Sequence, residues 1–289
     1  MFKISTEIES VSKHVGDRKA VELVAKAGFD AWDFSLFDMC RWDWEKRCIL
    51  PSEHPLAGKN YLAYARELRR IGEDMGIHCN QSHAPFPSEP MFDALVRSLE
   101  CTAEAGGKIC IIHPVNTHTA EQNAEMYERL LPIAKSVGVK IATENMWNWS
   151  YEKDEAMPAA CSDPETFLAH LNAVNDPDFV ACLDLGHAEM RGLGTTAPEM
   201  IRALGHHLQA LHIHDNDLHN DSHQIPFSMQ MDFAAIARAL REIGYSGYLT
   251  LEACEYLKDF TPDTLERGLS DLAESARRLG RMIEDSCSR

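Results

Sequence analysis

The chain has 289 residues, of which 45% are hydrophobic and 25% charged, a balance that excludes a largely disordered protein. The formal net charge is −17, and so acidic a surface repels phosphate backbones, which disfavours nucleic acid as a partner. The apolar runs are too short to cross a bilayer and the first residues lack the apolar stretch of a signal peptide, so we expect a cytoplasmic protein without a membrane partner.

Eight short β-rich runs alternate with longer amphipathic stretches along the chain. The predicted strands are Phe2–Ser5, Phe29–Ser35, Ile77–His83, Lys108–His113, Val139–Glu144, Phe179–Asp184, Leu208–His212 and Tyr248–Glu252. The predicted helices are Asp17–Ala27, Asn60–Met75, Met91–Ala105, Ala120–Val137, Pro164–Ala173, Ala197–His206, Asp232–Ile243 and Pro262–Ile283. Several strands are continuous apolar runs, which is typical of parallel strands covered on both faces.

Local signals at the helix ends agree with this alternation. Asp163 before Pro164 is typical of an N-cap followed by proline in the first turn. Glycines that can end a helix follow five of the predicted helices, at Gly28, Gly76, Gly106, Gly138 and Gly244.

The alternation of strands and helices predicts a single (β/α)₈ TIM barrel over residues 1–289, with its active site at the carboxyl ends of the strands. An open doubly wound sheet is disfavoured, because residues 5–12 after the first strand contain no glycine-rich phosphate loop. The aromatic-rich segments 41–47 and 147–151 are expected to be loops over the site.

Metal-ligand side chains close six consecutive predicted strands. They are His83, His113, Glu144, Asp184, His212 and Glu252. In a barrel these strand ends meet at one mouth, and burying carboxylates and imidazoles together is costly unless they share a cation or hydrogen bonds. Three carboxylates and one imidazole form an oxygen-rich site that favours Mn²⁺ or Mg²⁺, while additional histidines favour Zn²⁺, Co²⁺ or Fe²⁺. We therefore predict a divalent-metal site made by Glu144, Asp184, His212 and Glu252.

Further polar side chains follow two of these strands, Phe179–Asp184 and Leu208–His212. His187 lies three residues after Asp184, in an expected turn beginning with Gly186, where it could face substrate or a second metal. His214 is expected behind His212, in contact with the metal ligands. Asp221 and His223 form an Asp-x-His pair in the following loop.

Seven short motifs in chain order resemble those of the xylose isomerase-like barrel superfamily. They are residues 81–87 (QSHAPFP), 112–114 (IHP), 143–146 (TENM), 183–187 (LDLGH), 212–215 (HIHD), 221–223 (DSH) and 251–253 (LEA). The superfamily holds sugar and sugar-phosphate isomerases and epimerases, inosose dehydratases and endonuclease IV. The resemblance covers nearly the whole chain and implies a TIM-barrel enzyme.

The resemblance to the epimerase members implies a role for each ligand. Glu144, Asp184, His212 and Glu252 would bind the metal, Glu144 and Glu252 would exchange protons at the sugar carbon through an enediolate, and His187 would hold a substrate oxygen. Trp147 and Trp149 are candidates to cover an apolar sugar face. Because basic residues are few near the predicted mouth, a neutral sugar is favoured over a phosphorylated one.

Three alternatives stay open from the sequence. The same carboxylates could serve a lyase or dehydratase acting on an oxidised sugar or inosose. Resemblance to endonuclease IV implies a phosphodiesterase with three zinc ions, held by nine residues that are all present: His83, His113, Glu144, Asp184, His187, His212, Asp221, His223 and Glu252. Residues 224–231 (QIPFSMQM) stand where that family usually has a Pro-Gly-Glu-Gly turn, and the acidic charge also departs from a nuclease. A non-catalytic barrel subunit is the third alternative, and a homo-oligomer is compatible with every interpretation.

Overall fold

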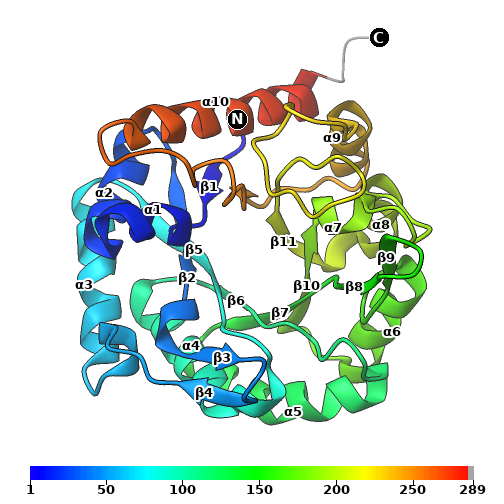
Figure 1. Cartoon of the computed structure of the whole chain (residues 1–289), viewed down its shortest axis with the longest axis horizontal. Helices are drawn as coiled ribbons and strands as arrows, with labels where there is room; N and C mark the ends of the chain where they lie inside the picture. Colours follow the sequence, from blue (N-terminus) through cyan, green and yellow to red (C-terminus); the bar gives the residue numbers. More distant parts are fainter. Residues whose placement is uncertain (286–289) are drawn as a thin grey trace.

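The structure, a computed structural model, describes residues 1–285 as a closed barrel of parallel strands within a ring of helices (Figure 1). The barrel strands are β1 (Ile4–Thr6), β2 (Ala31–Ser35), β5 (His78–His83), β6 (Ile109–Ile111), β7 (Lys140–Glu144), β10 (Phe179–Asp184), β11 (Leu208–His212) and β12 (Leu249–Leu251). Six of them form a sheet in the order β2-β5-β6-β7-β10-β11, and β1 pairs with β12. Parallel bridges from Glu7 to Asp33 and from Ile213 to Leu251 join these two sheets on both sides. The predicted TIM barrel is confirmed.

Each barrel strand is followed by a helix that covers the outside of the barrel. The long helices are α2 (Asp17–Lys26), α3 (Tyr61–Asp74), α4 (Phe92–Ala105), α5 (Ala120–Val137), α6 (Pro164–Val174), α8 (Ala197–Leu204), α9 (Phe233–Glu242) and α10 (Leu265–Asp285). Two short helices, α1 (Glu9–Val15) and α7 (Leu185–Glu189), were not expected from the sequence. Single 3₁₀ turns complete the connections, at η1 (Phe37–Met39), η2 (Pro55–Ala57), η3 (Glu89–Met91) and η4 (Gly205–His207).

The helix ends follow the local chemistry of the sequence. Asp163 caps α6, its side chain accepting hydrogen bonds from the backbone N–H groups of Glu165 and Thr166. Thr119 and Gln122 form a capping box at the start of α5, and Gly138 ends that helix with a left-handed backbone at φ 71°. These caps fix where each helix begins over the barrel.

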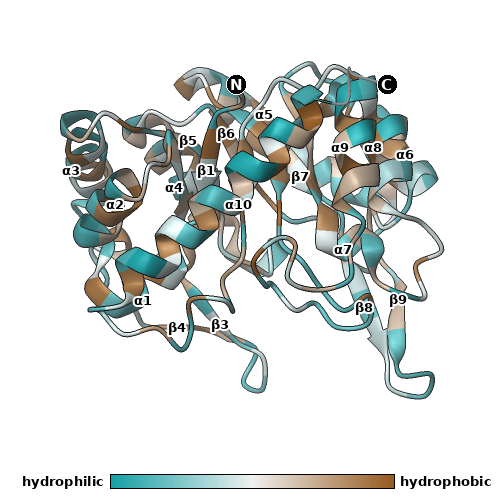
Figure 2. Cartoon of the chain, turned by 90° about the horizontal axis from the view of Figure 1, so that it is seen from above, coloured by the Kyte–Doolittle hydropathy of each residue, from teal (hydrophilic) through white to brown (hydrophobic). Residues whose placement is uncertain are grey.

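Two aromatic-rich segments form antiparallel hairpins, not the irregular loops expected from the sequence. The first hairpin consists of β3 (Arg41–Asp43) and β4 (Cys48–Leu50), and the second of β8 (Trp147–Ser150) and β9 (Glu155–Pro158). These strands were not predicted because they are short and carry no clear period-2 hydrophobic pattern. Both hairpins project from the same end of the barrel (Figure 2). Among the described helices, none combines the length and the apolar character needed to cross a membrane.

Candidate metal centre and active site

The period-2 alternation of the barrel strands places the predicted ligands inside the barrel mouth. Apolar side chains fill the interior below: Ile111, Ala142, Val180, Cys182 and Ala210 are buried together. His113, Glu144, Asp184 and His212 each stand two residues after one of them along the chain. Since side chains two residues apart share one face of a strand, the next layer above this apolar plug is a layer of ligands.

Four side chains from neighbouring strand ends form the central group. Glu144, Asp184, His212 and Glu252 each offer a ligand atom, and these atoms all lie within 4.8 Å of one another. His212 Nδ1 is 2.8 Å from Glu144 Oε1 and 3.5 Å from Glu252 Oε2. The structure therefore brings together the four residues predicted to hold the metal.

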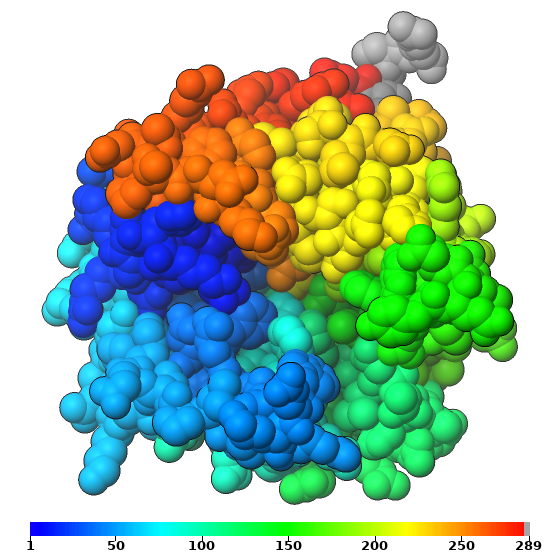
Figure 3. Space-filling model, viewed as in Figure 1, coloured from blue at the N-terminus to red at the C-terminus, as the bar shows by residue number. Residues whose placement is uncertain are grey.

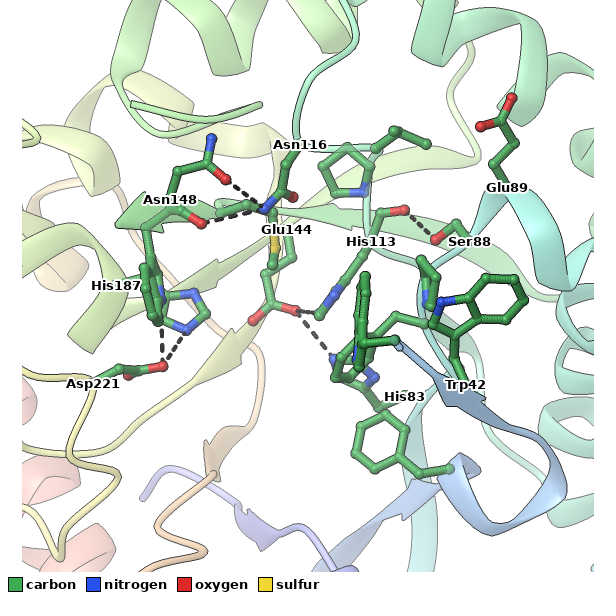
Figure 4. Close-up of a pocket in the computed structure, with 18 of the residues that line it drawn as sticks. Trp42, His83, Ser88, Glu89, His113, Asn116, Glu144, Asn148, His187 and Asp221 are labelled. Carbon is green, nitrogen blue, oxygen red and sulfur yellow. Dashed lines mark hydrogen bonds and ion pairs between the residues drawn. The ribbon is translucent and has the colours of Figure 1, made fainter. Parts of the chain in front are cut away.

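Two further groups adjoin the central one. His83 Nε2 and His113 Nε2 lie 3.3 and 3.1 Å from Glu144 Oε2. Glu144 therefore belongs to this group and to the central group. On the other side of the mouth, Asp221 Oδ2 is 3.2 Å from His187 Nε2 and 3.1 Å from His223 Nε2 (Figure 4). All nine of the ligand-type residues predicted from the sequence lie around one cavity or directly beneath it.

Backbone carbonyls fix the orientation of two imidazoles in the outer group. His187 Nδ1 donates to the backbone oxygen of Asn145 at 2.8 Å, and His223 Nδ1 donates to that of Glu252 at 2.7 Å. In each ring Nε2 therefore points to Asp221, with its lone pair available to a cation. His187 is held by α7, which replaces the expected turn: the Asp184 side chain accepts the backbone N–H of His187 at 2.7 Å and caps the helix.

The donor set fits divalent cations. The Oδ2 atom of Asp184 and the Oδ1 atom of Asp221 are buried and accept no hydrogen bond among the described residues. An unpartnered buried carboxylate oxygen is costly unless a cation occupies its free direction. Carboxylate oxygens with imidazole nitrogens suit Mn²⁺, Mg²⁺, Zn²⁺ or Co²⁺.

His214 is fully buried between the central and outer groups. Its Nε2 atom is 3.1 Å from Asp184 Oδ1 and 3.4 Å from Asp221 Oδ1. It contacts ligand-type residues of both groups, and its own ring offers a ligand atom to the outer group, so its place behind the metal ligands stays a prediction. Gly186 makes this position available, because a Cβ there would lie 2.0 Å from the His214 ring.

Two residues that were not predicted from the sequence, Asp33 and Asn145, position the ligands. Asp33 on β2 is buried, and its Oδ2 atom lies 3.3 Å from His212 Nε2 and accepts from Gln81 Nε2 at 2.8 Å. The Asn145 side chain bridges the ends of β7 and β10 by bonding both the N–H and the carbonyl oxygen of Asp184. An aspartate between Trp32 and Phe34 in the middle of a strand is the signal that could have identified Asp33.

The surroundings of the two glutamates of the site shift their pKa values in opposite directions. Burial opposes ionisation of Glu144, but the imidazoles of His212, His113 and His83 outweigh it and hold the pKa of this carboxyl well below its usual range. Burial raises the pKa of Glu252, which has fewer partners. Burial also opposes protonation of His187, but Asp184 and Asp221 together raise the pKa of this imidazole to about 10. The field of the carboxylates thus favours cations throughout the mouth.

A cavity of about 900 Å³ opens above the ligands, and the face of the molecule is hollowed there (Figure 3). His83, His113, Glu144, His187 and Glu252 are among the residues that line it. Trp147 lines the cavity and donates from Nε1 to Asp221 Oδ2 at 3.3 Å. Trp149 packs behind it, against Met190 and Leu193, and is not part of the lining that the described residues form.

Comparison with known proteins identifies the same fold as the structure, a TIM barrel. A family model described as "Xylose isomerase-like TIM barrel" matches residues 21–279. An uncharacterized protein of Methanocaldococcus jannaschii is 24% identical over 287 residues, which cover 87% of this chain and 89% of that protein.

Solved structures extend the comparison over the whole barrel. A D-tagatose 3-epimerase-like protein superposes with a TM-score of 0.72 at 18% identity, covering 99% of this chain and all of that one. The 3-keto-D-glucoside 4-epimerase YcjR of E. coli gives 0.68 at 14% identity, covering 95% and 100%. The IolI protein, whose crystal structure holds a zinc atom, gives 0.68 at 17% identity, covering 99% and 100%. At these identities the likeness is one of fold.

Proposed function

This chain belongs to the xylose isomerase-like TIM-barrel family, and from the site that it carries we propose that it is a divalent-metal-dependent sugar isomerase or epimerase. One observation carries the proposal: the ligand atoms of Glu144, Asp184, His212 and Glu252 converge on one point at the floor of an open cavity. The epimerases among structures of the same fold support this choice of reaction. We further propose that the protein acts in the cytoplasm.

The proposed cofactor is Mn²⁺ or Mg²⁺, because three of the four central ligands are carboxylates. A cation bound there would supply a positive charge that polarises the carbonyl and hydroxyl oxygens of a sugar. Asp184 and His212 would hold it from the buried side of the mouth. The outer group of His187, Asp221 and His223 would bind sugar oxygens or a second cation.

Glu144 and Glu252 are the proposed proton carriers. Both line the cavity, and they stand on β7 and directly after β12, so that a sugar ring lying between them presents a different face to each. One carboxylate would remove the proton next to the carbonyl and the other would return it, with an enediolate between the two steps. Because Nδ1–H of His187 is bound to Asn145, the protonated ring would donate a hydrogen bond from Nε2 to a substrate oxygen, and the neutral ring would accept one there from a substrate hydroxyl. Trp147 would exclude water from one side of the ring.

Solvent-isotope exchange tests this mechanism. The protein loaded with Mn²⁺ is incubated with ketoses and keto-glycosides in D₂O, and we expect deuterium at the carbon next to the carbonyl. Glu252→Gln should lower the exchange rate by at least roughly 10²–10⁴-fold, because it removes an acid–base group. Glu255→Gln, which alters a surface carboxylate paired with Lys258, is the matched control and should keep the wild-type rate. Equal rates in both variants would refute the role of Glu252.

A lyase or dehydratase is compatible with the same first step. After removal of the proton, loss of a hydroxyl or of another leaving group from the neighbouring carbon would give an unsaturated product. The same incubation separates the two outcomes, because an isomerase returns a sugar of unchanged mass apart from deuterium, whereas a dehydratase product has lost water.

A metal-dependent phosphodiesterase is the second candidate, favoured by one feature. Glu144 belongs both to the central group and to the group of His83 and His113, while the third group lies across the mouth, so the cavity offers places for three cations. The net charge of −17 opposes binding of a nucleic acid. Three tightly bound zinc ions per chain together with cleavage of an abasic DNA duplex would establish this function. A single bound cation without cleavage would exclude it.

A further inference from the structure

The cavity above the ligands has two chemically different parts. The floor and one side are polar, formed by the imidazoles and carboxylates of the three ligand groups, with Asn116 and Asn148 above the outer group. Trp42 lies beside His83, on the opposite side of the cavity from His187 and Asp221 (Figure 4). On this second side the lining is aromatic, and we call the set Phe37, Trp42, Trp44 and Phe86 the aromatic wall.

The aromatic wall begins at the ligand layer. The Phe37 ring contacts that of His83 edge-on with centroids 4.8 Å apart, and the Phe86 ring stacks on that of His113 at 5.0 Å. Phe37 and Phe86 contact each other at 5.5 Å. A ligand whose polar part reaches His83 and His113 therefore has these phenyl rings directly beside it.

The upper end of the aromatic wall is exposed to solvent. Trp44 at the tip of the β3–β4 hairpin is 67% exposed, and Phe86 is 43% exposed. Ile49 and Leu50, on the same hairpin as Trp44, are 49% and 38% exposed. Apolar surface gathered at one place on a protein marks a binding site, whereas single exposed apolar residues need no explanation. Here that surface continues into the cavity that holds the candidate catalytic groups.

The volume and charge of the cavity limit what it accepts. About 900 Å³ is near the upper end of the roughly 300–1,000 Å³ in which proteins bury drug-sized ligands, and a free monosaccharide is much smaller than such a ligand. Arg47 is the one lysine or arginine among the described residues of the lining, and it stands on the exposed hairpin. A phosphate or carboxylate on the outer part of the ligand would meet the carboxylates of Glu9 and Glu89 instead of a cluster of cations.

We propose that the substrate is an aryl glycoside, whose sugar ring lies over Glu144 and Glu252 and whose neutral aromatic group lies along the aromatic wall. This inference rests on the proposed isomerase or epimerase function and defines its substrate class. Aromatic rings bind one another by offset stacking or edge-to-face contact, and Trp42 and Trp44 line the same cavity as Phe37 and Phe86.

The chemistry adds one requirement to the substrate. The anomeric carbon of a glycoside bears no carbonyl group, so the carbonyl that makes a neighbouring proton acidic must stand on another ring carbon. The reacting form is therefore a keto-glycoside. A dehydrogenation of a secondary ring hydroxyl is the class of reaction that must supply it.

Binding of unreactive glycosides tests the inference without turnover. Dissociation constants of phenyl β-D-glucoside and methyl β-D-glucoside are measured by calorimetry on the full chain loaded with Mn²⁺. We expect the phenyl compound to bind about tenfold more tightly than the methyl compound. Trp44→Ala and Phe86→Ala should each weaken phenyl glucoside by roughly 2- to 12-fold, the range for one lost aromatic contact, and leave methyl glucoside unchanged.

Matched controls separate this effect from general loss of structure. Tyr151→Ala removes an aromatic side chain that is 93% exposed on the other hairpin and does not line the cavity, so it should bind both glucosides as the wild type does. Because Trp44 and Phe86 are both substantially exposed, their alanine variants should fold. Equal affinity for the two glucosides, or equal losses in Tyr151→Ala, would overturn the inference.

Two other outcomes distinguish failure of the aryl-glycoside inference from failure of the proposed function. If Trp44→Ala dissociates an oligomer while the preference for phenyl over methyl glucoside persists, the exposed apolar surface is an interface between copies of this chain, and the substrate inference is overturned. Failure of the proposed function has a different signature. Aromatic-dependent binding of phenyl glucoside without deuterium exchange into any ketose or keto-glycoside would refute the isomerase function and support the aryl-glycoside site.

Discussion

Asp33→Asn is the substitution that most directly tests how the central metal site is positioned. In the wild type, Asp33 Oδ2 faces His212 Nε2 at 3.3 Å and accepts from Gln81 Nε2 at 2.8 Å. Because the Nε2–H of His212 is directed at this carboxylate, Nδ1 keeps its lone pair toward Glu144 and Glu252, where the cation is proposed to bind.

The substitution removes the charge and keeps the shape. An amide oxygen in the place of Oδ2 can accept both hydrogen bonds, and the amide NH₂ takes the place of Oδ1, which has no partner among the described residues. His212 becomes a less basic ligand. Loss of such an outer partner weakens metal binding by about 10–100-fold, equivalent to about 1.4–2.7 kcal/mol. The buried NH₂ without an acceptor should also lower the free energy of unfolding by about 1–3 kcal/mol.

The assay is competition for Mn²⁺ between the protein and a fluorescent chelator, with circular dichroism to verify the fold. Asp17→Asn is the control, because Asp17 is also buried and lies 3.2 Å from His54 Nε2, outside the cavity lining. It should lose stability and keep the wild-type affinity for Mn²⁺. A folded Asp33→Asn protein that binds Mn²⁺ within twofold of the wild type would show that the orientation of His212 does not depend on Asp33.

Two further predictions concern groups at the mouth. Burial raises the pKa of Glu7, which accepts from the N–H and hydroxyl of Ser10, to about 7 from an ordinary 4.5. The folded protein then holds a proton that the unfolded chain releases, so the contribution of Glu7 to the free energy of unfolding should fall between pH 5 and 7 by about 1.4 kcal/mol per pH unit. Urea unfolding of the wild type and of Glu7→Gln measures this, and the free energy of unfolding of the variant should rise relative to that of the wild type as the pH rises. Gly186→Ala places a Cβ 2.0 Å from the His214 ring, so calorimetry should show a lower Tm and chelator competition a weaker affinity for Mn²⁺; wild-type values of both would mean that α7 moves freely away from His214.

The barrel and its ring of ligands could be predicted because their signals are local. Glu144, Asp184 and His212 each end an apolar run, and the TIM-barrel topology alone brings the strand ends together. No side chain has to be placed in three dimensions for this step. The roles of the individual ligands stay predictions, since geometry shows that they meet and not what they bind.

The features that the sequence did not reveal depend on contacts between distant segments. Helix α7 has only five residues, too few for a periodic pattern, and it is held by the cap from Asp184 and by packing of Gly186 on His214. Asp33 meets His212 across 179 positions of sequence, and one aspartate within a strand gives no indication of its partner. The aromatic wall likewise joins the β3–β4 hairpin to Phe86, which follows a different strand.

The mouth concentrates charge in a way that a purely structural cluster would avoid. Four carboxylates and five imidazoles gather from six strand ends and two following segments. Three of these nine side chains, Glu144, Asp184 and His212 on the floor, are at most 1% exposed. Against the effect of burial, neighbouring acidic groups raise the pKa of His212 and His223 well above the ordinary range. A divalent cation would balance the same carboxylates and would also satisfy the buried Oδ2 atom of Asp184. The electrostatic field that retains protons on these histidines is therefore the field that would select a cation.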